Sequence, residues 1–133
     1  MKADEIIQSY YKHFNSGHWE GMLALLSEDV VHDANQGSRT QGKAAFRSFL
    51  HEMAMHYQER LTDICVMTHP DGLRAAAEFI CHGTYLKTQA GLPEAKRQTY
   101  RLPVGAFFEL KHGLITRVSN FYNLPDWIRQ VKG

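Results

Sequence analysis

Three stretches near the start of the chain place apolar residues on one face of a helix, with polar residues between them. This pattern predicts helices over residues 3–14, 19–26 and 46–57. The third is the clearest because Phe46, Phe49, Leu50, Met53 and Tyr57 recur at spacings of three or four. Between the second and third helices, Val30-Val31 predicts a short strand, which leads into a loop from His32 to Gln41.

The pattern changes after Glu59, where β-branched and aromatic residues become frequent. Four strands are predicted, over residues 61–68, 73–88, 98–110 and 114–122. Turn-forming residues separate them, and Gly113 falls where a tight hairpin needs a left-handed residue. Pro125 suits the first turn of a short helix at the end of the chain. Helices followed by consecutive long strands indicate one α+β domain over residues 1–133, with the helices packed on a strongly curved antiparallel sheet around one apolar pocket.

The segment Leu102–Leu110 is apolar at nearly every position, although a half-buried strand should alternate. Such a run indicates that both faces of the strand are covered. One face would meet the helices and the pocket. The other would meet a second copy of the chain, so we predict a homodimer that pairs through the sheet.

Composition narrows the choice of partners. The net charge is +1 and no helix carries a basic stripe, so no nucleic-acid partner is expected. No apolar run is long enough for a membrane span, and the first residues lack the apolar segment of a signal peptide. We therefore expect a cytoplasmic protein with no membrane partner. Cys65 and Cys81 are expected to be buried free thiols.

Two near-matches to known motifs carry little weight. Residues 37–44 approach a phosphate-binding loop, but Ala44 stands where that loop needs a magnesium-binding hydroxyl. His51 and His56 are five apart rather than four, so they point about 140° apart on a helix and are expected at the surface. No other spacing suggests a metal site, and no nucleophile motif for covalent catalysis occurs. No metal and no organic cofactor is expected.

Acid–base chemistry is the remaining possibility. Asp33 directly follows an apolar strand, and a carboxylate held near apolar walls would have a raised pKa and act as a proton acceptor. Tyr10 lies on the inward face of the first helix, where its hydroxyl could bind a substrate oxygen. The alternatives remain open: Asp33 could cap a loop, and Tyr10 could be a core residue bonded to a backbone carbonyl.

Three stretches carry a resemblance to a known family. They are Tyr10 with Asn15-Ser16-Gly17, Val31-His32-Asp33 with Gly42-Lys43-Ala44, and Pro103–Phe107 leading to Gly113. With the order of elements, they resemble the nuclear transport factor two-like superfamily over essentially the whole chain. That group has a cystatin-like cone and includes the ketosteroid isomerases and the SnoaL-like polyketide cyclases. His32–Gly37, Gly91-Leu92-Pro93 and Tyr122-Asn123-Leu124 are similar to a subgroup labelled steroid isomerase-related or SnoaL-like.

The resemblance implies roles for particular residues. Asp33 matches the general base of the isomerases, and Tyr10 matches the phenol that binds the developing enolate oxygen. The third member, an acid on a central strand, falls on Gly105, which argues against cyclase chemistry. Asn120 or Tyr122 could supply the missing donor. The face of Glu78 and His82 stays open. Substrate contacts are expected from Asn35, Tyr57, Phe107, Val118, Asn120 and Tyr122.

We therefore expect a cofactor-independent isomerase or cyclase-type enzyme that acts on a small apolar carbonyl compound. In this hypothesis Asp33 removes a proton next to the carbonyl and Tyr10 stabilises the enolate. The alternative is a domain of the same fold that binds a small apolar ligand without turnover. A scaffold role would leave the polar residues of the pocket without a purpose.

Overall fold

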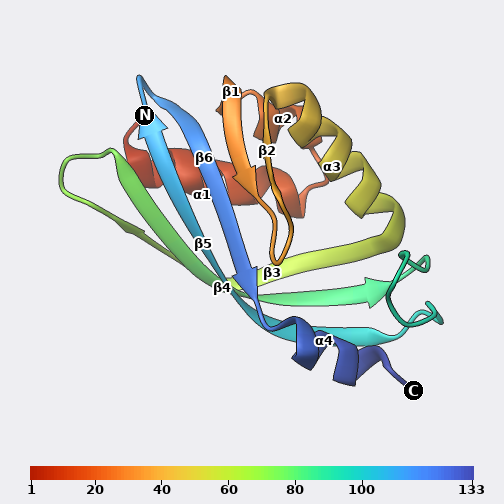
Figure 1. The fold of residues 1–133 in the computed structure, drawn as a ribbon. Helices are drawn as coiled ribbons and strands as arrows, with labels where there is room; N and C mark the ends of the chain where they lie inside the picture. Colours follow the sequence, from red (N-terminus) through yellow and green to blue (C-terminus); the bar gives the residue numbers. More distant parts are fainter.

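The computed structural model describes residues 1–133, which form an α+β fold with helices packed on one six-stranded curled sheet (Figure 1). This confirms the predicted fold class. The helices are α1 (Ala3–Asn15), α2 (Trp19–Leu23), α3 (Lys43–His56) and α4 (Leu124–Val131). The strands are β1 (Leu26–Asp33), β2 (Arg39–Gln41), β3 (Tyr57–Thr68), β4 (Arg74–Tyr85), β5 (Thr99–Lys111) and β6 (Leu114–Tyr122).

The order of strands across the sheet is β2-β1-β6-β5-β4-β3. All neighbours run antiparallel, as predicted, except β1 and β6, which are parallel. Parallel neighbours need a long connection, and here α3 and the β3–β5 meander lie between β1 and β6. Strand β1 thereby lies beside β6 at one side of the sheet.

Local sequence explains the ends of several elements. Helix α1 has Asp4 and Glu5 in its first turn and Lys12 in its last, which suits the helix dipole. The side chain of Asn123 accepts a hydrogen bond from the Asp126 N–H at 3.1 Å and caps α4. His112 and Gly113 have φ values of 54° and 76°, as a two-residue hairpin turn between β5 and β6 requires.

Helix α3 ends one residue earlier than its apolar spacing predicted. Tyr57 is already extended, and its ring stacks on Tyr85 of β4 with centroids 5.5 Å apart. Packing against the sheet therefore outweighs the helical pattern at this position. His56, expected at the surface, is buried: Nδ1 lies 2.9 Å from the Lys87 carbonyl and Nε2 lies 3.1 Å from Glu52.

The core lies between the concave face of the sheet and the helices. In Figure 1, α1 passes behind the long strands, α3 runs beside β1 and β2, and α4 follows the end of β6. Tyr10 and Tyr11 of α1 pack against Phe108 of β5, with ring centroids 5.8 Å and 6.1 Å away. None of the four helices combines the length and apolar character needed to cross a bilayer.

The convex face of the sheet carries exposed apolar side chains. Phe107, Phe121 and Met67 are about half exposed, and the rings of Phe107 and Phe121 are 5.8 Å apart. Within one chain the convex side of Leu102–Leu110 is largely open, because Pro103 and Phe107 are exposed and Gly105 and Glu109 are only partly covered. The apolar run in β5 predicted that both faces of this strand are covered. Within the single chain, only the concave face is covered.

Two adjacent phenylalanines on β5 test this division of faces. Phe108→Ala should lower the free energy of unfolding by about 3–5 kcal/mol, because Phe108 is fully buried and its removal leaves a cavity. Phe107→Ala, the matched control on the convex face, should cost less than about 1 kcal/mol in dilute solution. Urea unfolding measures both, and equal losses would contradict the assignment of faces.

Candidate functional site

A cavity of about 860 Å³ lies between the concave face of the sheet and helices α1, α3 and α4. Its volume is within the range of small-molecule sites. Most of its wall is apolar, since 22 of its 31 lining residues are hydrophobic. The few polar groups in this wall therefore determine how a ligand can be oriented.

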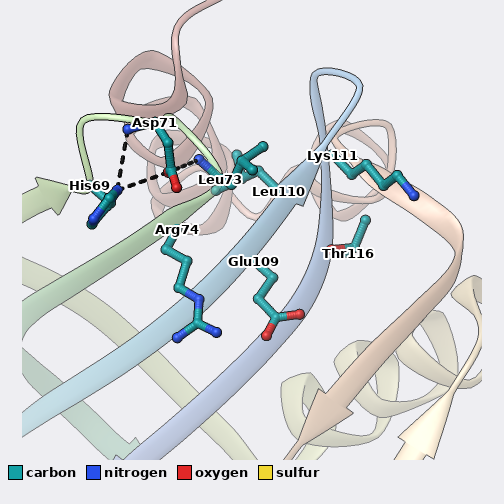
Figure 2. A pocket seen from close by; sticks show the side chains of 8 residues that line it. All are labelled: His69, Asp71, Leu73, Arg74, Glu109, Leu110, Lys111 and Thr116. Carbon is teal, nitrogen blue, oxygen red and sulfur yellow. Dashed lines mark hydrogen bonds and ion pairs between the residues drawn. The ribbon is translucent and has the colours of Figure 1, made fainter.

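A second depression of about 490 Å³ lies on the surface where β4 begins and the β5–β6 hairpin turns (Figure 2). Leu73 and Leu110 are its only hydrophobic lining residues. His69 Nδ1 lies 3.0 Å from an Asp71 carboxylate oxygen and accepts a hydrogen bond from the Asp71 N–H, and Asp71 also accepts a hydrogen bond from the Leu73 N–H. This arrangement stabilises the turn, so the internal cavity is the stronger candidate.

Glu59 of β3 is the only carboxylate that lines the cavity. Side chains alternate along a strand, so Glu59 shares the concave face with Tyr57 and Leu61. Its carboxylate accepts a hydrogen bond of 2.6 Å from the Tyr100 hydroxyl. Glu59 as a whole residue is exposed, but the atoms packed around its carboxylate desolvate it and raise its pKa above the ordinary value, and hydrogen bonds from Tyr100 and Cys81 only partly oppose this rise. A carboxyl with a raised pKa is suited to proton transfer.

A glycine makes the contact between Tyr100 and Glu59 possible. Gly83 of β4 lies between them in register, opposite Glu59 on one side and Tyr100 on the other. A Cβ at Gly83 would lie 2.1 Å from the Tyr100 ring. The ring therefore crosses the glycine and delivers its hydroxyl to the next strand.

Two further phenols lie near Glu59. The Tyr57 hydroxyl donates a hydrogen bond to Gln89, and burial raises the pKa of Tyr57 and of Tyr122. The charge of Glu59 adds to the rise at both, which shows that both lie within its electrostatic reach. Both phenols therefore stay protonated near neutral pH. The Tyr57 O–H is already engaged by Gln89, whereas the Tyr122 O–H can donate a hydrogen bond to a ligand oxygen.

Three buried polar atoms in the cavity wall have no hydrogen-bond partner in the protein. They are the Tyr11 hydroxyl, His32 Nε2 and Asn35 Nδ2. Burial lowers the pKa of His32, so its ring is neutral near pH 7. The Asn35 Oδ1 atom is satisfied, because it accepts a hydrogen bond from the Tyr122 N–H at 3.1 Å. Unpartnered buried polar atoms are rare, and here all three belong to residues that line the cavity.

The structure divides the sequence-predicted site residues into two groups. Five of them line the cavity: Tyr10, Asn35, Tyr57, Asn120 and Tyr122. Three do not: Asp33, Phe107 and Val118. Val118 is fully buried in the core, and Phe107 is half exposed on the convex face.

The prediction of a raised pKa for Asp33 is wrong. Arg39 binds its carboxylate through two hydrogen bonds of 2.7 Å and 3.0 Å, and the Ser119 hydroxyl donates a third of 2.6 Å. These bonds lower the pKa of Asp33 to about 2. Residues alternate along β1, so the neighbouring His32 faces the cavity and Asp33 lies on the opposite side.

Gly105 lies on the convex face as well. A Cβ there would meet nothing within 4 Å, and its neighbour Val104 lines the cavity instead. A glycine at position 105 therefore says nothing about cyclase chemistry. The inward positions of β5 between 102 and 108 are Leu102, Val104, Ala106 and Phe108, none of them an acid. Glu78, whose face was left open, pairs with Gly105 in register and is exposed.

Sequence reasoning missed Glu59, although a signal was present. The segment Tyr57-x-Glu59-x-Leu61 alternates, and a carboxylate between two apolar residues of one face indicates a charged group aimed inward. Placing the end of the third helix at Tyr57 hid this pattern.

The thiols also differ from prediction, because Cys81 is buried but Cys65 is exposed. No group of three or more His, Cys, Asp or Glu side chains is arranged to hold a metal ion.

Comparison with known proteins gives a consistent result. A family model described as "SnoaL-like domain" matches residues 7–118 of this chain. A crystal structure from Pseudomonas putida KT2440, described as "a putative polyketide cyclase", is 56% identical, has a TM-score of 0.97 and matches over 98% of each chain. A structure with the same description from Xanthomonas campestris pv. campestris is 53% identical, with a TM-score of 0.95, over 98% of this chain and 96% of that one.

A more distant structure is described as "putative ketosteroid isomerase" and comes from Kribbella flavida DSM 17836. It is 25% identical with a TM-score of 0.65, and the match covers 91% of this chain and 77% of that one. No curated protein matches this chain significantly.

The hydrogen bonds of Asp33 make a prediction about acid stability. Its pKa is lower in the folded protein than in the unfolded chain, so its contribution to stability is present above the ordinary pKa of 3.8 and is lost as the pH falls toward about 2. Asp33→Asn should therefore be less stable than the wild type at pH 7 and should lose less stability over this acidic window. Urea unfolding as a function of pH measures the effect. The exposed aspartate of the same strand provides the control Asp29→Asn, and an equal change in both variants would contradict the prediction.

Proposed function

The chain belongs to the SnoaL-like domain family, and on this premise we propose that it is a cofactor-independent enzyme of the isomerase or cyclase type. Family and related structures support a cyclase-type, isomerase-type or ligand-binding role. The proposed substrate is a small apolar carbonyl compound that binds in the cavity. The observation that carries the proposal is the single carboxylate in an apolar wall, Glu59, with a raised pKa.

In the proposed mechanism Glu59 is the general base. Its carboxylate removes a proton from the carbon next to the substrate carbonyl, which gives an enolate and a protonated Glu59. Return of this proton to another carbon of the conjugated system completes an isomerisation and restores the carboxylate. In a cyclase the enolate carbon would instead attack a second carbonyl of the same substrate, and the oxygen of that carbonyl would take the proton back from Glu59. Both reactions need proton transfer and stabilisation of an enolate oxygen.

Tyr122 and Asn35 are the proposed donors to this oxygen. The phenol lies within the electrostatic reach of Glu59, and the Asn35 amide N–H₂ has no partner in the protein. One such donor contributes about 3–4 kcal/mol to transition-state stabilisation in a comparable case. The family resemblance suggests a different assignment, with Asp33 as the base and Tyr10 as the donor. The substitution experiment described below also tests this second assignment.

The alternative function is binding of an apolar ligand without turnover. The observation that favours it is the apolar inward face of β5, which offers no second acid to the cavity. In that case Glu59 would accept a hydrogen bond from a ligand hydroxyl and transfer no proton. The two functions differ in turnover and share the binding site.

We also propose that the chain is a homodimer that pairs through the convex face of the sheet. The half-exposed side chains of Phe107, Phe121 and Met67 on this face support the proposal, because soluble monomers rarely expose such apolar clusters.

Substitution of Glu59 tests the proposed function. The wild type should convert β,γ-unsaturated ketones to their α,β-unsaturated isomers, followed by ultraviolet absorbance. Glu59→Gln should lower kcat/KM by about 10²–10⁴-fold, because the amide cannot accept the proton. The wild-type rate should rise with pH through the raised pKa of Glu59. Glu28→Gln makes the same change at a largely exposed carboxylate and is the matched control.

The outcomes separate the hypotheses. Loss of activity in Asp33→Asn but not in Glu59→Gln would move the base to Asp33. Ketone binding by the wild type without any turnover would favour the ligand-binding alternative. Glu59→Gln should also raise stability at neutral pH, because a carboxyl with a raised folded-state pKa destabilises the fold once it is ionised.

Sedimentation velocity tests the dimer. The wild type should sediment as a dimer at micromolar concentration, and Phe121→Glu should be monomeric because it places a charge in the centre of the proposed interface. Lys132→Glu, an exposed change beyond α4, is the control. A monomeric wild type would contradict the proposal.

A further inference from the structure

The Glu59 carboxylate is held by a phenol that lies outside the cavity. The Tyr100 hydroxyl donates a hydrogen bond of 2.6 Å to Glu59 Oε2, a length typical of a bond to a charged acceptor. Tyr100 is only 5% exposed, and it does not belong to the residues that line the cavity. A ligand in the cavity can therefore contact Glu59 without contacting the group that holds it.

The neighbours of Tyr100 keep its ring in place. The ring lies over Gly83, where a Cβ would be 2.1 Å away, and it packs edge-on against Trp127 of α4 with centroids 5.8 Å apart. The Gln130 side chain of α4 exchanges hydrogen bonds of 2.8 Å and 2.9 Å with the backbone of Arg101, the next residue along β5. Helix α4 is thus anchored beside Tyr100. Glutamate is among the side chains with the most rotamer freedom, so a fixed phenol is what restricts the Glu59 carboxylate.

The two carboxylate oxygens of Glu59 have different surroundings. Tyr100 occupies Oε2, and the only other donor to the carboxylate is the Cys81 thiol, which is a weak donor. Tyr57 and Tyr122 are the further phenols within its electrostatic reach, and no lysine, arginine or second acid lines the cavity. The remaining titratable side chains of the wall are those of Tyr10, Tyr11 and His32. No cation therefore competes with Tyr100 for the carboxylate, and Oε1 is the oxygen left for a substrate.

We propose that Tyr100 is a positioning residue for the general base: its hydroxyl fixes the Glu59 carboxylate through Oε2, so that Oε1 takes the proton from the substrate and returns it. In the first step the C–H bond breaks, its electron pair stays on the substrate as the enolate, and an O–H bond forms at Oε1. Return of the proton reverses this at another carbon, and the Tyr100 O–H bond stays intact throughout. This inference rests on the proposed role of Glu59 and adds to it a residue outside the ligand space.

The test is Tyr100→Phe, which removes the hydroxyl and keeps the ring over Gly83. For β,γ-unsaturated ketones, kcat should fall about 10- to 100-fold with little change in KM, because the base is less well placed and the substrate contacts are unchanged. The lost hydrogen bond stabilised the ionised carboxylate, so the pKa of Glu59 should rise further and the acid limb of the rate profile should move to higher pH. A more basic carboxylate alone would raise the plateau rate, so a lower plateau indicates lost positioning.

Two further variants separate this role from a structural one. Tyr85→Phe is the matched control, because Tyr85 is a buried phenol of the same aromatic cluster whose hydroxyl donates to the Pro93 carbonyl at 2.7 Å. It should leave kcat and the pH profile unchanged. Gly83→Ala adds the Cβ that displaces the Tyr100 ring, so it should reproduce both effects of Tyr100→Phe. Urea unfolding checks that each variant is folded, and Tyr100→Phe decides the question even if Gly83→Ala does not fold.

An unchanged plateau and pH profile in Tyr100→Phe would overturn the inference, and so would a change confined to KM. NMR titration of the Glu59 side-chain carboxyl gives a readout that needs no turnover. The pKa of Glu59 should be higher in Tyr100→Phe than in the wild type, and equal values would reject the hydrogen bond itself. Full activity in Glu59→Gln rejects the proposed function and this inference together. Loss of activity in Glu59→Gln without an effect of Tyr100→Phe rejects this inference alone.

Discussion

Neighbouring residues on a strand point to opposite faces of a sheet, and the two faces of this sheet have different surroundings. Helices and the cavity lie on the concave side, whereas the convex side carries exposed aromatic rings and an ion-pair network. A shift of one residue therefore moves a group from one environment to the other. His32 and Asp33 are adjacent, yet one is a neutral ring in a cavity wall and the other a carboxylate bound by an arginine.

This constraint explains how much the sequence could predict. Helix spacing and turn residues identified the elements and the fold class, because both signals are local. The inward direction of Tyr10 also followed from its helix, since a helical face is defined by several residues at once. The face of a strand residue depends on a register that only the neighbouring strands determine. The assignments of Asp33, Gly105 and Phe107 to the pocket each failed by one position for this reason.

The candidate site places one carboxylate beside a largely apolar wall. Glu59 is held in the wall by one phenol and approached by a thiol, and no cation accompanies it. A cation would lower its pKa, as Arg39 does for Asp33 on the other face. The protein thus contains two carboxylates with opposite pKa shifts, and their surroundings distinguish a group suited to proton transfer from one that stabilises the fold.

The Tyr100 ring lies over Gly83 and reaches Glu59 without itself lining the cavity. The residue that adjusts the acidity of the carboxyl is thus separate from the residues that set the shape of the ligand space. In relatives with this fold, a substitution at position 100 could change the pKa of the carboxyl without altering the substrate. A substitution in the cavity wall could alter the substrate without changing that pKa. Such independence lets one scaffold diversify in small steps, each of which alters a single property.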